Sequence, residues 1–194
     1  MGNKLIVITG LDGSGTSALA EALSAKDPGS CVFKTPGPPF DGFRSLVDEQ
    51  VRALSQPAHY LFYLSSVVFA STQIEKHLEQ GNVYCVRYLI DTVVSHRAGG
   101  LDVEIDYDTQ LYSIRKPDLT LMVQTVEAAR QKRISARGKG FLDRLLDDNV
   151  LRDAFRREFD NLAHHYVTVS NDGPDIGSAM QTAVAHMPWM NEYV

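Results

Sequence analysis

Short apolar runs alternate with longer amphipathic stretches along this chain. Residues 5–9 (LIVIT), 83–86 (VYCV) and 119–123 (LTLMV) are continuous apolar runs, which are typical of strands buried on both faces of a parallel sheet. Shorter runs at residues 31–34 (CVFK) and 166–169 (YVTV) predict two further strands. The pattern therefore predicts a five-stranded sheet.

Segments of helical composition separate the apolar runs. We expect helices at residues 17–26, 43–54, 59–79, 90–97, 127–137, 149–164 and 176–187. Strands that alternate with helices predict an α/β fold with a parallel sheet, and right-handed crossovers place helices on both of its faces. No linker divides the pattern, so we expect one domain over residues 1–194.

The expected topology also gathers several loops. Ligands in such sheets bind outside the carboxyl ends of the strands. This rule brings residues 10–17, 35–39 and 87–88 and the segment after residue 123 to one end of the molecule.

Composition excludes several classes of protein. The 194 residues are 44% hydrophobic with a formal net charge of -5, so a groove for a nucleic acid polymer is not expected, although local arginines can still bind a small anion. Cys31 and Cys85 lie in apolar runs and predict core thiols. Without a signal-peptide pattern or a run of about 18 apolar residues, we expect a cytoplasmic protein and no membrane partner.

A glycine-rich loop follows the first predicted strand. GLDGSGTS at residues 10–17 fits the phosphate-binding pattern G-x-x-x-x-G-K-[ST] except that Thr16 occupies the lysine position. Backbone N–H groups in such a loop surround a phosphate, and a hydroxyl at the Ser17 position binds Mg²⁺. We expect ATP to bind the residues of this loop, namely Gly10, Gly13, Ser14, Gly15, Thr16 and Ser17. The fold is then a P-loop NTPase three-layer fold with a five-stranded parallel sheet flanked by helices.

The missing lysine has a chemical consequence. Loss of one electrostatic contact of this kind costs on the order of 10²–10³ in rate, whereas a positioned arginine contributes ~10³–10⁵ in phosphoryl transfer. We therefore expect a nearby arginine to supply the charge that Thr16 lacks.

Four motifs together resemble those of thymidylate kinases. They are GLDGSG at 10–15, RY at 87–88, PDLTL at 117–121, and Arg133-x-x-x-Arg137-x-x-x-x-x-Asp143-Arg144. The resemblance extends over about residues 5–187. It implies transfer of the γ-phosphoryl group of ATP to a nucleoside monophosphate with Mg²⁺, and a mobile lid, here at about residues 134–148. It also implies a homodimer, with the apolar helix at residues 59–79 as the expected interface.

The resemblance assigns roles to individual residues. Asp12 matches the acid that holds the acceptor sugar hydroxyl, Arg87 the arginine that binds the acceptor phosphate, and Phe62 the aromatic that stacks on the base. An aspartate bonded to its own turn and a core phenylalanine are the alternatives for Asp12 and Phe62. The lid arginines, which a solvated helix face would also explain, complete the candidate catalytic set of Asp12, Arg87, Arg133, Arg137 and Arg144.

The chain departs from the family pattern at chemically important positions. Val86 replaces the acid immediately before Arg87, and Ser66 lies where thymidylate kinases carry an arginine that reads the thymine edge. Asp91 belongs to a helix whose family counterparts also touch the base. Ser66, Asp91 and Phe62 are the candidate substrate-binding residues, and the identities of Ser66 and Asp91 indicate a rebuilt pocket. We infer that thymidine monophosphate is not the preferred acceptor.

Three functions remain open from the sequence. The first is a kinase that uses ATP and Mg²⁺ on a nucleotide-like acceptor, with a lid arginine in place of the loop lysine. The second is a nucleotide-binding module that has lost catalysis, which Thr16 and Val86 favour. The third is a kinase of a small non-nucleotide phosphate or phosphonate.

Overall fold

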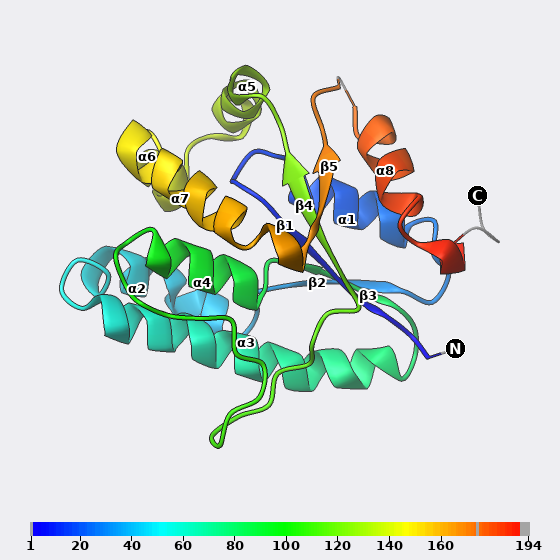
Figure 1. Cartoon of the computed structure of the whole chain (residues 1–194), viewed down its shortest axis with the longest axis horizontal. Coiled ribbons are helices and arrows are strands. Elements are labelled where there is room, and N and C mark those ends of the chain that lie inside the picture. Colours follow the sequence, from blue (N-terminus) through cyan, green and yellow to red (C-terminus); the bar gives the residue numbers. More distant parts are fainter. Residues whose placement is uncertain (1, 174, 191–194) are drawn as a thin grey trace.

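A computed structural model describes residues 2–173 and 175–190 of the chain. At its centre is a five-stranded parallel sheet of order β2-β3-β1-β4-β5 (Figure 1). The strands are β1 (Leu5–Thr9), β2 (Cys31–Lys34), β3 (Val83–Val86), β4 (Leu119–Gln124) and β5 (Val167–Ser170). Since all pairings are parallel, every strand ends at the same edge of the sheet.

Helices cover both faces of the sheet and make a three-layer α/β architecture (Figure 1). The α-helices of the described residues are α1 (Thr16–Ser24), α2 (Arg44–Gln50), α3 (Gln56–Leu78), α4 (Leu89–Arg97), α5 (Glu127–Arg137), α6 (Phe141–Leu145), α7 (Asn149–Asn161) and α8 (Gly177–Val184). Helices α3, α4 and α7 pack on one face, and α1 and α8 pack on the other.

The alternation of side chains in β1 explains why its whole sequence is apolar. Leu5 and Val7 point into the core beneath α3 and α4, whereas Ile6 and Ile8 point into the core beneath α1 and α8. All four side chains are fully buried, as expected for the central strand of a parallel sheet.

The strand predictions are confirmed, with differences of one residue in β4 and β5. The helix expected at residues 43–54 is shorter, because the chain leaves the helix after Gln50 and Ser55 starts α3 by accepting a hydrogen bond from the Ala58 N–H at 3.2 Å. Cys31 and Cys85 are free thiols whose pKa values burial raises. No helix of the described residues has the length and apolar character needed to cross a membrane.

Helix α6 was not predicted. Its five residues follow two glycines, and its start is stabilised by Asp143, whose carboxylate accepts the Gly140 N–H at 2.9 Å. An acid that reaches back to the N–H three residues earlier is half of a capping box. This local signal was present in the sequence at residues 140–143.

Candidate active site

The loop after β1 has a backbone that only glycine adopts easily. Gly10, Gly13 and Gly15 have φ values of 151°, 85° and 104°. A Cβ atom on Gly10 would lie 2.5 Å from the Val123 carbonyl oxygen, and one on Gly15 would collide with Asn171. The loop is therefore packed tightly against Val123 and Asn171 and leaves no room for side chains at Gly10 and Gly15.

This loop has the features of an anion site. Gly15 begins α1 without a side-chain cap, so the first N–H groups of the helix are free to bind a ligand. The Ser14 hydroxyl is buried without a hydrogen-bond partner among the described residues. Ser17 is the second residue of α1. It is exposed, so its hydroxyl is accessible. The residues of the loop fit the phosphates of a nucleotide.

A cavity of about 430 Å³ opens in front of the loop. Its walls include Asp12, Thr16 and Ser17. Thr16 is nearly buried, and its short side chain ends in a methyl group near Gly10 rather than in a charge. Five cationic side chains also line this phosphate cavity, namely Lys34, Arg44, Arg87, Arg133 and Arg137.

Arg87 is held between two carboxylates. It has the only positive φ of a described non-glycine residue, 67°, and it donates to Asp12 on one side and to Asp91 at 2.9 Å on the other. Asp91 also accepts from the Thr9 hydroxyl at 2.7 Å and from the Tyr88 N–H at 3.0 Å. The guanidinium is thereby fixed at the carboxyl end of β3, facing the phosphate cavity.

The same charges set the protonation of the site. Burial by itself would raise the pKa of Asp12, but the guanidinium of Arg87 and, more weakly, those of Arg137 and Arg44 outweigh it and lower the pKa. Burial would lower the pKa of Arg87, whereas Asp12 and Asp91 raise it. At neutral pH the pair is fully ionised.

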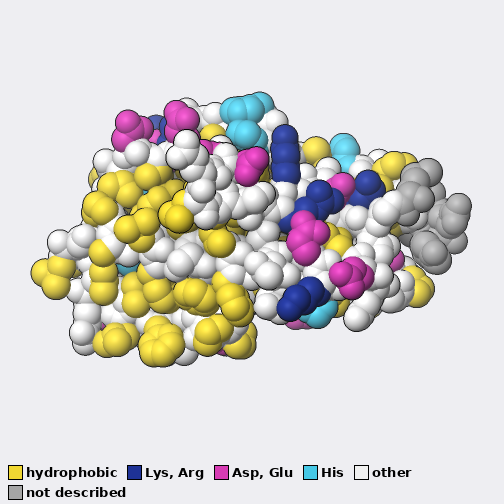
Figure 2. Space-filling model, turned by 90° about the horizontal axis from the view of Figure 1, so that it is seen from below, with side chains coloured by type: hydrophobic (Ala, Val, Ile, Leu, Met, Phe, Trp, Pro, Cys, Tyr) yellow, Lys and Arg dark blue, Asp and Glu magenta, His cyan; other side chains and the backbone are white. Residues whose placement is uncertain are grey.

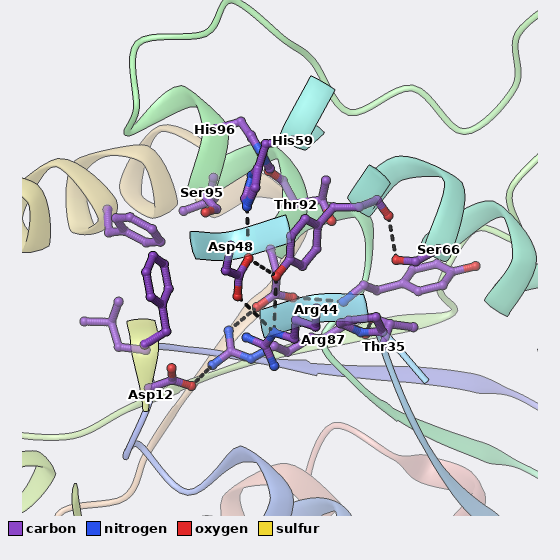
Figure 3. A pocket seen from close by; sticks show the side chains of 18 of the residues that line it. Asp12, Thr35, Arg44, Asp48, His59, Ser66, Arg87, Thr92, Ser95 and His96 are labelled. Carbon is purple, nitrogen blue, oxygen red and sulfur yellow. Dashed lines mark hydrogen bonds and ion pairs between the residues drawn. The ribbon is translucent and has the colours of Figure 1, made fainter. Parts of the chain in front are cut away.

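A second, narrow cavity adjoins Arg87 between α3, α4 and α7 (Figure 3). One part of its wall is apolar and consists of Phe141, Leu146, Phe155 and Phe159. The polar part, shown in Figure 3, includes Asp48, His59 and His96. Asp12 and Arg87 line both cavities, and we call this one the acceptor cavity, because the resemblance assigns these two residues to the acceptor.

The polar wall of the acceptor cavity is a continuous hydrogen-bonded chain. His59 Nε2 lies 2.9 Å from an Asp48 carboxylate oxygen, and His59 Nδ1 lies 2.7 Å from His96 Nε2. Tyr63 donates to the same Asp48 oxygen at 2.7 Å. Burial would raise the pKa of Asp48, but the bonds from His59 and Tyr63 and the charge of Arg44 lower it. One oxygen of this carboxylate takes both bonds, and the other lies 3.5 Å from Arg44 Nε.

Comparison with known proteins identifies the architecture. The family model for thymidylate kinase matches residues 8–175. The chain belongs to the thymidylate kinase family. Membership implies a nucleotide kinase, that is, a phosphotransferase. No match to the chain was found among the curated proteins.

Two solved thymidylate kinases are similar in fold. That of Candida albicans superimposes with a TM-score of 0.71 at 23% identity, over 99% of this chain and 93% of that chain. That of Ehrlichia chaffeensis gives 0.67 at 18% identity, over 96% of this chain and 100% of that chain. The expected P-loop fold is confirmed.

Of the three predicted substrate-binding residues, two line the acceptor cavity and one does not. Ser66 and Asp91 line it, but the Ser66 hydroxyl donates to the Tyr63 carbonyl at 2.7 Å, and Asp91 positions Arg87. Phe62 is not among the described residues that line the cavity; its ring packs edge-on against Phe40 with centroids 5.7 Å apart. Tyr63 takes the place expected for Phe62, one residue further along α3.

The lid arginines of the thymidylate kinase pattern are already engaged. Arg133 donates to the carbonyls of Ser14 and Asn171, at 3.2 and 2.9 Å, and so ties the loop to the end of β5. Arg137 donates to both oxygens of the buried Asp143, at 2.9 and 3.0 Å. Arg144 is exposed, donates to the Lys139 carbonyl, and is not among the residues around the phosphate cavity.

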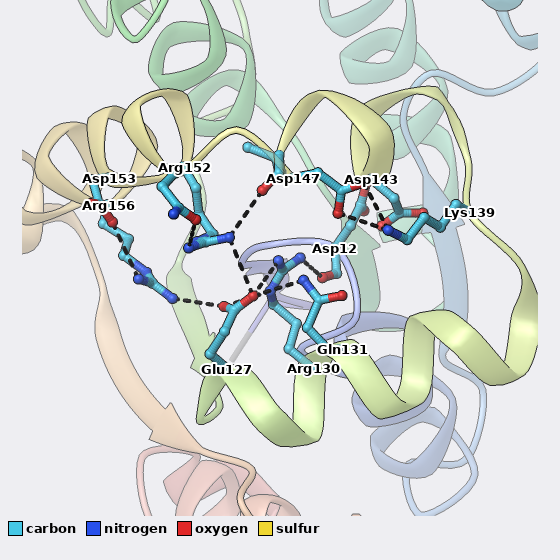
Figure 4. A network of polar contacts seen from close by, with 12 residues as sticks. Asp12, Glu127, Arg130, Gln131, Lys139, Asp143, Asp147, Arg152, Asp153 and Arg156 are labelled. Carbon is cyan, nitrogen blue, oxygen red and sulfur yellow. Dashed lines mark hydrogen bonds and ion pairs between the residues drawn. The ribbon is translucent and has the colours of Figure 1, made fainter.

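An arginine that the sequence analysis did not single out supports the loop from behind (Figure 4). Arg130 of α5 is 1% exposed and donates to the Asp12 carbonyl at 3.0 Å and to Glu127 at 2.7 Å. Arg156 and Arg152 also approach Glu127. The hydrogen bond from Arg130 lowers the pKa of Glu127 to about 2. This network fixes the backbone at Asp12.

Proposed function

We propose that this protein transfers the γ-phosphoryl group of ATP to a nucleoside monophosphate or nucleotide-like acceptor other than thymidine monophosphate. The observation that carries the proposal is the position of Arg87. Its guanidinium lies where the phosphate cavity meets the acceptor cavity, and Asp12 and Asp91 hold it there. A cation at this junction can bind the acceptor phosphate next to the group being transferred.

The glycine loop would hold ATP and its metal. The N–H groups at the start of α1 would bind the phosphates, and the Ser17 hydroxyl would be a ligand of Mg²⁺. The described residues contain no group of three or more His, Cys, Asp or Glu placed to hold a metal ion. The Ser17 hydroxyl and the nucleotide phosphates together suit Mg²⁺, which commonly binds one or two protein oxygens together with nucleotide phosphates. Mg²⁺ supplies charge neutralisation of the phosphates when bound.

The acceptor cavity supports a change of substrate. Ser66 turns its hydroxyl back to the helix, so it presents no donor in place of the arginine expected for a thymine-reading site. The nearby carboxylate of Asp48 is committed to His59 and Tyr63. A buried wall with different donors and acceptors rejects a base whose polar groups it leaves unpaired.

The test is acceptor-dependent ADP formation. The protein is incubated with Mg-ATP and a panel of nucleosides, nucleoside monophosphates and small phosphonates. We expect turnover with a nucleoside monophosphate that exceeds turnover with thymidine monophosphate, and its loss in Arg87→Met. Equal or greater turnover with thymidine monophosphate would contradict the proposed specificity.

A second function has a specific observation in its favour. Thr16 is nearly buried and carries no charge, so the protein could bind nucleotide without transferring phosphate. Tight binding of ATP with no ADP formed on any acceptor would establish this function instead. Turnover on phosphonates alone would favour a kinase of small non-nucleotide acceptors.

Two further features complete the proposal. The segment at residues 134–148 acts as a lid of the single domain 1–194, because its Phe141 lines both cavities and its Asp143 lines the phosphate cavity. The protein forms a homodimer through the face of α2 and α3. Figure 2 shows apolar side chains gathered on the side of the molecule where α3 lies. The large exposed apolar residues of these helices and their flanks are Phe43, Leu46, Leu54, Leu61 and Phe69.

A further inference from the structure

Lys34 is the last residue of β2, at the edge of the sheet where the strands end. It is paired in register with Val86, the last residue of β3, and it lines the phosphate cavity together with Thr16 and Ser17. Val86 is apolar and buried, so the neighbouring strand offers no carboxylate at this level. Within residues 2–173 and 175–190, Lys34 makes no side-chain hydrogen bond or ion pair.

The other cations around the phosphate cavity have partners. Arg87 pairs with two carboxylates, and Arg137 pairs with buried Asp143. Arg44 lies 3.5 Å from Asp48 and donates to Tyr63. Arg133 donates to the carbonyls of Ser14, Asn171 and Gly173. Within the described residues, Lys34 is therefore the cation of this set whose side chain has neither a hydrogen-bond partner nor an ion-pair partner.

We propose that Lys34 supplies the ammonium charge that Thr16 cannot supply. The assignment rests on the proposed kinase function. In the transfer, the bond between the γ-phosphorus of ATP and its bridging oxygen breaks, and ADP keeps the electron pair. A new bond forms from an oxygen of the acceptor phosphate to the γ-phosphorus. Lys34 forms no bond in this step and stabilises the charge on the transferred group from the β2 side.

Three variants test this role. Lys34→Met removes the charge from an exposed side chain, Lys34→Arg keeps it, and Lys34→Met with Thr16→Lys moves it to the loop. We expect kcat to fall by on the order of 10²–10³ in Lys34→Met, to be largely kept in Lys34→Arg, and to recover in the double variant. Lys132→Met, at an exposed position on α5, is the matched control.

Calorimetric binding of inorganic tripolyphosphate gives a readout that needs no turnover. We expect its affinity to fall about tenfold in Lys34→Met, the size of one charge-assisted hydrogen bond. Unchanged tripolyphosphate affinity and kcat would overturn the assignment, as would failure of Thr16→Lys to restore Lys34→Met. If no acceptor is phosphorylated, the proposed function fails, yet tripolyphosphate binding still decides whether Lys34 faces the phosphates.

A different observation concerns the acceptor. Arg52 follows α2, is 9% exposed, and lines the acceptor cavity. Its one side-chain hydrogen bond is a long contact of 3.4 Å to the neutral hydroxyl of Ser95. Across the part of the chain that the structure describes, no carboxylate forms an ion pair with it. Burial lowers the pKa of Arg52, and the charge of Asp48 only partly offsets this, because the Asp48 carboxylate forms its hydrogen bonds with His59 and Tyr63.

A buried guanidinium without an ion-pair partner destabilises the folded protein, because no ion pair offsets the free energy of removing the charge from water. We infer that the acceptor brings the anion: a nucleotide whose base carries a carboxylate, bound by Arg52 at the end of the cavity remote from the phosphates. A planar guanidinium matches the two oxygens of a carboxylate. This inference also rests on the proposed function and names its class of acceptor.

A matched pair of ligands tests the inference. Thymidine monophosphate and 5-carboxy-2′-deoxyuridine monophosphate form this pair: the first carries a methyl group where the second carries a carboxylate. Orotidine monophosphate is a third ligand, whose carboxylate is on the adjacent ring position. We expect a carboxylated nucleotide to bind at least about tenfold more tightly than thymidine monophosphate by calorimetry. Arg52→Gln should remove this preference, whereas Arg115→Gln, on the loop before β4, should not.

Equal affinity for all three nucleotides, or a preference that survives Arg52→Gln, would overturn the role of Arg52. Binding is measured without ATP, so this result does not depend on catalysis. Failure of the kinase proposal would show separately, as an absence of ADP formation with every acceptor.

Discussion

The chain of Asp48, His59 and His96 fixes the positions of its own protons. The Thr92 carbonyl can only accept, so His96 Nδ1 donates to it at 2.7 Å. Burial lowers the pKa of His96 to about 4, which leaves its Nε2 as an acceptor for His59. His59 Nδ1 is then the donor to His96, and His59 Nε2 lies against the Asp48 carboxylate beneath the acceptor cavity.

This arrangement predicts how stability depends on pH. A histidine with a folded-state pKa of about 4, below its ordinary 6.5, favours the neutral form in the folded protein. Its contribution is complete above pH 6.5 and is lost as the pH falls toward 4. Loss of this contribution should lower the free energy of unfolding by on the order of 2 kcal/mol between pH 7 and pH 4.

Denaturant unfolding at several pH values checks this. His96→Asn should be less stable than the native chain at pH 7 and should lose less further stability by pH 4. His186→Asn, at an exposed position, should keep the native pH profile. An identical slope in His96→Asn and the native chain would contradict the protonation assigned here.

Single residues also show where sequence reasoning stopped. Phe62 and Tyr63 are neighbours on α3, and a difference of about 100° in helix rotation decides which ring faces the cavity. Apolar spacing did not resolve that rotation, because the residues around them are apolar on several sides. Lys34 was overlooked for another reason: its importance comes from the phosphate cavity that β2 reaches in the folded sheet.

Among the elements, the buried strands were predictable and helix α6 was not. Residues 5–9 and 83–86 are apolar throughout because both faces of the sheet are covered, so their bounds followed from composition. Helix α6 has only five residues, too few to show a helical period, and Gly138 and Gly140 precede it. Its formation depends on Asp143, which binds Arg137 and Gly140 together. Such cooperation between side chain and backbone is not visible as periodicity.

Asp143→Ala should loosen the lid. The change leaves the Gly140 N–H and Arg137 without their buried partner, so a five-residue helix loses its start. We expect amide hydrogen exchange over residues 138–148 to accelerate by about tenfold or more, and phosphoryl transfer to slow. Exchange is measured by mass spectrometry.

Asp147→Ala is the matched control in the same segment. Asp147 pairs with Lys139 at 2.7 Å, but both side chains are at least 40% exposed, so this pair contributes little. Equal exchange rates in the two variants and the native chain would contradict the role given to Asp143.

For the whole molecule, the apolar face of α2 and α3 predicts association. Leu61 and Phe69 lie eight residues apart on one side of α3 and are 60% and 39% exposed. Leu61→Glu with Phe69→Glu should convert the proposed homodimer to a monomer, measured as mass by light scattering after gel filtration. Leu111→Glu changes an even more exposed leucine in the loop before β4 and should leave the dimer intact. A native chain that is monomeric at micromolar concentration would contradict this interface.

The account as a whole depends on a nucleotide phosphate lying against the N-terminus of α1. Calorimetric titration of Mg-ATP into the full chain, repeated with saturating tripolyphosphate, tests this directly. The account predicts one equivalent of ATP bound per chain and its displacement by tripolyphosphate, because the phosphates carry the binding. Absence of ATP binding, or binding that tripolyphosphate does not displace, would contradict it.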